Sequence, residues 1–111
     1  MTDKNRSSQM LKGILSGCIL VLLDYETLYG YTLSLKLEEI GFDQIPKGTI
    51  YPLLLSLEKK GFIASTLVPS PDGPSRKYYH LTNSGKNEKA YFMTEWQQLQ
   101  LNVSTLLDRF S

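Results

Sequence analysis

The residues of this chain whose types and spacing suggest chemistry are hydrogen-bond donors and cations. Lys47, Thr49 and Tyr51 lie together in one segment, and Arg76 and Lys77 are adjacent in a second. Lysine and arginine pair with phosphate or guanine. Threonine donates, accepts or presses its methyl group on thymine, and tyrosine adds a hydroxyl and a ring. These two clusters are typical of a surface that contacts a nucleic acid.

Enzyme chemistry has no comparable basis in the sequence. His80 is the only histidine and falls in a predicted strand, while Cys18, the only cysteine, falls in an apolar stripe. The chain has no His/Cys cluster with metal-ligand spacing and no glycine-rich phosphate loop. A nucleophile beside a base, which covalent catalysis requires, is also missing. We therefore expect no catalytic activity, no metal and no other cofactor.

Composition predicts an ordinary globular protein. The 111 residues are 41% hydrophobic and 21% charged, with a net charge of +1, so a basic surface must arise from local clustering. A single cysteine excludes an intrachain disulfide. The longest apolar run, Cys18 to Leu23, is far shorter than the roughly 20 residues that span a bilayer, and the polar N-terminus does not resemble a secretion signal. We expect a soluble cytoplasmic protein with no membrane contact.

Apolar residues at helical spacing predict helices over Gln9–Leu23, Tyr31–Ile40 and Lys47–Lys60. Alternating leucines in the second segment also permit a strand, but its lysine and glutamates and the following Gly41 favour a helix. Pro52 is tolerated only near a first turn, so the third helix should begin near its lysine. Strands are predicted over Phe62–Val68 and Ser75–Leu81, around a turn rich in proline and glycine.

A last helix should begin at a Thr82 or Asn83 cap and run to about Phe110. Its apolar residues are separated by 4, 3, 4, 3 and 4 positions: Phe92, Trp96, Leu99, Val103, Leu106 and Phe110. This spacing is the heptad seam of a helix that packs along another helix. Because roughly 40 Å of helix exceeds what so small a domain covers, a second copy of the chain is the expected partner.

The order of three helices, a hairpin and a long helix predicts a mainly α fold with a small β-hairpin. This is a winged helix-turn-helix over residues 1–82, followed by a C-terminal dimerisation helix over residues 83–111. In a helix-turn-helix the second helix of the pair enters the DNA major groove, which assigns that role to Lys47–Lys60. The DNA-binding residues are then expected to be Lys47, Thr49, Tyr51 and Pro52 on this helix and Arg76 and Lys77 on the hairpin, where they straddle a phosphate backbone or probe the minor groove.

Each feature also has a plainer interpretation. Tyr51 on a helix face is more often a packing residue than a base contact. Arg76 and Lys77 are also what an edge strand carries to prevent aggregation. Trp96 in a heptad seam is equally well explained as a packed interface residue. A winged-helix interaction module without specific DNA binding therefore stands beside a DNA-binding regulator.

Several ordered motifs resemble the PadR family of transcriptional regulators. They are Tyr29-Gly30-Tyr31, the run from Lys47 to Leu54, the run from Leu57 to Ile63, and the run from Arg76 to Gly85. The last helix is similar in length and position more than in residues, as in the subgroup with a single C-terminal helix. The resemblance implies a homodimeric repressor of a palindromic operator. It also implies a small hydrophobic or aromatic effector at the dimer centre, stacked on Trp96.

Overall fold

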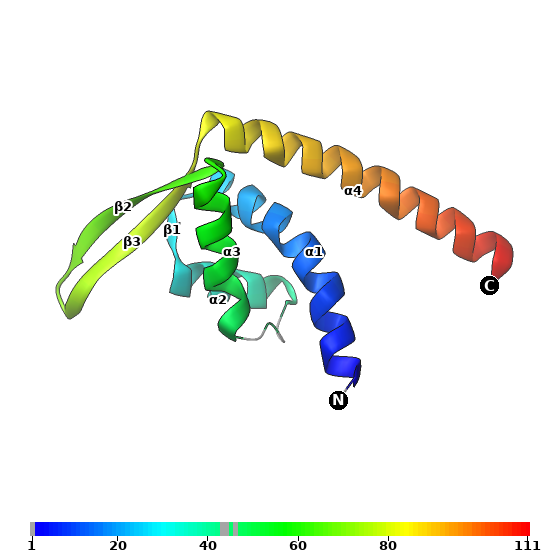
Figure 1. The fold of residues 1–111 in the computed structure, drawn as a ribbon, viewed down its shortest axis with the longest axis horizontal. Helices are drawn as coiled ribbons and strands as arrows, with labels where there is room; N and C mark the ends of the chain where they lie inside the picture. The colour runs from blue at the N-terminus through cyan, green and yellow to red at the C-terminus, as the bar shows by residue number, and fades with distance from the viewer. Residues whose placement is uncertain (1, 43–44, 46) are drawn as a thin grey trace.

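The structure, a computed structural model, describes residues 2–42, 45 and 47–111. Its elements follow in the order α1 (Thr2–Tyr25), β1 (Leu28–Tyr29), α2 (Gly30–Ile40), α3 (Lys47–Lys59), β2 (Ile63–Ser70), β3 (Gly73–Leu81) and α4 (Asn83–Phe110). Figure 1 shows the first three helices gathered into one body, from which the β2–β3 hairpin projects on one side and α4 extends on the other. The predicted mainly α fold with a hairpin and a long last helix is confirmed.

One apolar core joins the first three helices to the base of the sheet. Leu15, Ile19, Leu33, Leu54 and Ile63 are at most 2% exposed. The alternating leucines of α2 lie on a helix and not on a strand. Leu33 and Leu37, which are four residues apart, are buried, whereas Leu35 between them is exposed. The helix ends at the predicted glycine, whose φ of 126° is a conformation that side chains rarely allow.

The sheet has three strands in the order β1-β3-β2, all antiparallel. Strand β1 was not predicted, because two residues are too few to show alternation. It exists because the edge of β3 offers partners, Tyr79 for Leu28 and Tyr78 for Tyr29. The hairpin is also longer than predicted, since pairing continues to Ser70 and Gly73 past an irregularity that accommodates a proline.

Among the described residues, helix α4 packs against the body through its first third. Of the two predicted caps, Thr82 is the one used: its hydroxyl caps the helix by accepting from the Gly85 N–H at 3.0 Å. Gly85 is buried so close to the backbone carbonyl of Phe62 that a Cβ would overlap it. Further along, Lys89 Nζ donates to Asp24 of α1 at 2.6 Å. Beyond Phe92 every residue of α4 is exposed, so the remainder of the helix projects from the body (Figure 1).

Candidate nucleic-acid interface

Helix α3 separates an inner apolar face from an outer polar one. Its stripe of Ile50, Leu54 and Leu57 is buried against the core, as its spacing predicted, while Tyr51 is 55% exposed. Pro52 is also on the outer face. The expectation that Thr49 faces outwards is wrong: its side chain is only 6% exposed, because it lies one turn before Leu53 and beside Ile50 at the inward-facing edge. The Lys47 side chain lies outside the described residues.

Tyr51 is held against the start of α2. A Cβ placed on Gly30 would lie 2.6 Å from Tyr51 Cε1 and 2.9 Å from its Cζ and hydroxyl oxygen, and these are the three nearest atoms. Only a residue without a side chain at position 30 therefore lets this ring lie where it does. Sequence reasoning missed this role of Gly30, although the Tyr29-Gly30-Tyr31 motif drew attention to the position.

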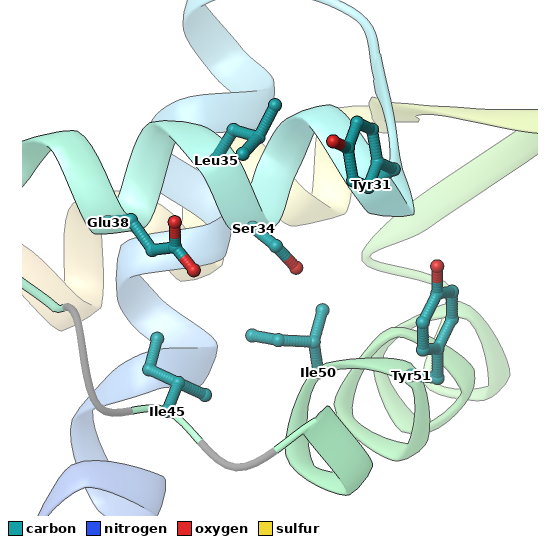
Figure 2. A pocket seen from close by; sticks show the side chains of 7 residues that line it. All are labelled: Tyr31, Ser34, Leu35, Glu38, Ile45, Ile50 and Tyr51. Atoms are coloured by element: carbon teal, nitrogen blue, oxygen red, sulfur yellow. The ribbon is translucent and has the colours of Figure 1, made fainter.

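A hollow of about 310 Å³ opens between α2 and α3 beside the Tyr51 ring. Its lining is mostly aliphatic and aromatic, from Tyr31, Ser34, Leu35, Glu38, Ile45, Ile50 and Tyr51. Figure 2 shows the two tyrosines at one end and Glu38 with Ile45 at the other. Tyr31 is itself 60% exposed, so two tyrosine rings reach solvent where the two helices meet. The open space also leaves the Tyr51 ring room to move.

Arg76 lies on one face of the hairpin and is oriented by aromatic rings. Its guanidinium carbon stands 4.7 Å from the ring centroid of Tyr29, and that ring packs 5.0 Å from the ring of Tyr78. Within the part of the chain that the structure describes, no carboxylate lies within ion-pair distance of Arg76. The stack leaves an exposed, unneutralised cation about midway along the hairpin, where Arg76 pairs with Val68.

Lys77 lies on the opposite face of the same strand, because successive strand residues alternate. Its Nζ is 3.2 Å from Glu58 Oε1 on α3, and Ser65 on β2 donates to the other Glu58 oxygen at 2.7 Å. The Ser65 hydroxyl, followed by Lys77, lowers the pKa of Glu58, and the same carboxylate raises the pKa of Lys77. The two adjacent cations therefore differ: Lys77 is paired and Arg76 is not.

The predicted seam of α4 is divided by the fold. Phe92 is half-buried, with its ring against Gly17 of α1 in the same chain. The other members are exposed: Trp96 (38%), Leu99 (55%), Val103 (46%), Leu106 (56%) and Phe110 (79%). The chain thus carries an apolar stripe about four turns long that its own domain does not cover.

The two residues considered for catalysis lie on different elements, His80 on β3 and Cys18 on α1. His80 is exposed on β3, and burial raises the pKa of the half-buried Cys18 thiol, which disfavours the reactive thiolate. Among the described residues no group of three potential metal ligands comes together. No helix in the described ranges is long and apolar enough to cross a membrane.

Comparison with known proteins gives a consistent result. The model of the transcriptional regulator PadR-like family matches residues 19–91. A PadR-like transcriptional regulator from Bacillus cereus is 47% identical, with 90% of this chain and 97% of that chain covered and a TM-score of 0.79. A Streptococcus transcriptional regulator is 45% identical over 88% and 96% of the two chains, with a TM-score of 0.79. A PadR family regulator from Eggerthella lenta is 33% identical over 96% and 95%, also with a TM-score of 0.79. No curated protein matches the chain.

Proposed function

This chain belongs to the PadR-like family of transcriptional regulators, and we propose that it acts as a cytoplasmic homodimeric repressor of a palindromic operator. The family consists of regulators and not of enzymes, which agrees with the lack of catalytic chemistry expected from the sequence. The observation that carries the proposal is the outer face of α3, where Tyr51 and Pro52 are exposed on a helix that packs against a hairpin carrying an unpaired arginine.

In this proposal the N-terminal half of α3 enters the major groove. Tyr51, with Pro52 beside it, presents a hydroxyl and a ring to base edges, and Lys47 at the helix start pairs with phosphate or guanine. Thr49 is part of the inner packing and makes no base contact in this conformation. Of the two hairpin cations, we assign the phosphate contact to Arg76, because Lys77 is bonded to Glu58.

The homodimer is supported by the uncovered stripe on α4. Five apolar side chains at heptad spacing are exposed from Trp96 to Phe110, and a second copy buries them by knobs-into-holes packing. A two-fold dimer presents two recognition helices to half-sites about one DNA turn, or a multiple of it, apart, which requires a palindromic operator. Trp96 stands where this stripe begins. A small hydrophobic or aromatic effector could therefore stack between two symmetry-related indoles.

The proposal is tested by binding of the purified protein to a few hundred base pairs upstream of its gene and to scrambled DNA, at two salt concentrations. Selection from a random-sequence DNA pool provides a second route to the operator. We expect dimers that select a palindromic motif, and Tyr51→Ala should weaken binding to that motif more than binding to scrambled DNA. Failure to select any motif would overturn the proposal and leave the winged-helix interaction module. The single tryptophan then reports effector binding by fluorescence.

A further inference from the structure

Glu58 lies on the surface of α3 that faces DNA in the proposed function. It follows Tyr51 by seven residues, which is two helical turns and returns to the same side of the helix. It also lines the same shallow outer surface as Pro52 and Lys59. A carboxylate in this place repels DNA phosphates unless its charge is neutralised.

The structure neutralises Glu58 with Lys77 and fixes the pair from three elements. Each carboxylate oxygen has one partner, Ser65 Oγ of β2 at 2.7 Å and Lys77 Nζ of β3 at 3.2 Å. The ammonium also stands 5.5 Å from the ring centroid of Tyr79, whose side chain is buried. Lys77 is therefore directed towards α3, away from the face on which Arg76 stands.

We propose that Glu58 is a specificity-determining residue: it withholds Lys77 from DNA phosphates, so that the hairpin contributes one sequence-independent cation contact, from Arg76, instead of two. This inference rests on the proposed DNA-binding function. Phosphate contacts raise affinity for every sequence alike, whereas base contacts favour the operator. A regulator that suppresses a phosphate contact binds other DNA less tightly and gains in selectivity for its operator.

The pair permits a test by charge cancellation. In Glu58→Gln the lysine is released, and we expect tighter binding to scrambled DNA with a salt slope steeper by about 0.9. Between 50 and 200 mM salt, this change makes the loss of affinity about 3.5-fold larger than in the wild type. In Lys77→Gln the unpaired carboxylate faces DNA, and binding should weaken. The double variant restores a neutral surface, so its slope and its affinity for scrambled DNA should match the wild type.

The opposite changes in affinity of the two single variants distinguish the proposal from a purely structural salt bridge. Loss of a purely structural salt bridge would loosen the hairpin and weaken DNA binding in both single variants. Glu39→Gln, which removes an exposed carboxylate from α2, controls for the change in net charge. Urea denaturation checks that each variant is folded. An unchanged salt slope in Glu58→Gln would overturn the proposal. A double variant with a shallower salt slope than the wild type would also overturn it, because Lys77 of the wild type would then already contact phosphate. Absence of any operator in the wild type would instead refute the proposed function.

Discussion

Replacement of Gly30 by alanine should reduce operator selectivity without unfolding the protein. The new Cβ would lie 2.6 Å from Tyr51 Cε1, whereas ordinary contact begins at 3.4 Å, so the ring must retreat by about 0.8 Å. Tyr51 is 55% exposed and borders the α2–α3 hollow, so it has room to do so. In the proposed complex with DNA, a displaced hydroxyl would lose its hydrogen bond to a base. At about 0.5–1.5 kcal/mol, this loss lowers the ratio of operator to scrambled affinity about two- to twelvefold.

Stability should change little in this variant. Gly30 does not have a positive φ, so alanine fits its backbone and gains about 0.4–1 kcal/mol by restricting the unfolded chain. This gain offsets part of the cost of moving the ring. We expect the free energy of unfolding in urea to remain within about 1 kcal/mol of the wild type.

The assay compares dissociation constants on the operator and on scrambled DNA for wild type, Gly30→Ala, Tyr51→Ala and the double variant. Gly13→Ala in α1 is the matched control, because a Cβ there meets nothing within 4 Å. If Gly30 acts through the ring, its substitution has no further effect once Tyr51 is alanine. Equal losses of selectivity in both backgrounds would refute this reasoning, as would an unchanged ratio in the single variant.

Three further predictions concern the rest of the chain. Leu106→Glu places a charge in the exposed stripe of α4 and should convert dimers to monomers in sedimentation experiments. Thr105→Glu, on the other side of the helix, should leave the dimer intact. A dimer that survives in Leu106→Glu would place the interface elsewhere. Asp24→Asn should lower the free energy of unfolding at neutral pH. The hydrogen bond from Lys89 holds the pKa of Asp24 below its unfolded value, so the difference from wild type should disappear as the pH falls below about 4, and a difference that persists in acid would exclude this pair as its cause. Gly85→Ala forces a methyl group onto a backbone carbonyl and should destabilise the protein by about 1–3 kcal/mol or more in urea. Gly13→Ala is again the control and should be no less stable than the wild type, because its methyl group meets nothing within 4 Å.

The course of the chain could be predicted from the sequence wherever the signal is local. Helical spacing identifies one apolar stripe on each of α1, α3 and α4, Gly41 ends α2, and one of the two predicted caps, Thr82, begins α4. Each of these signals depends on residues within one or two turns of one another, so no tertiary information is needed to read them. The same holds for the heptad seam, although its burial by a partner remains a prediction.

The arrangement of the site depends on contacts between distant segments, which spacing alone does not contain. Strand β1 exists only because β3 pairs with it, and this pairing brings Tyr29 under Arg76. Thr49 follows the same helical rules as its neighbours, but the position of α3 against the core decides that it is buried.

The two adjacent cations of β3 show the division most clearly. Their sequence makes them equivalent, since both are positive residues in a predicted hairpin. Strand alternation already places them on opposite faces, which the sequence contains. Only the docking of α3 against the sheet puts Glu58 beside Lys77 and leaves Arg76 on aromatic rings. Composition and periodicity thus determine which elements form, whereas tertiary packing decides which charges are neutralised, because ion pairing requires atoms a few ångströms apart from segments far apart in the chain.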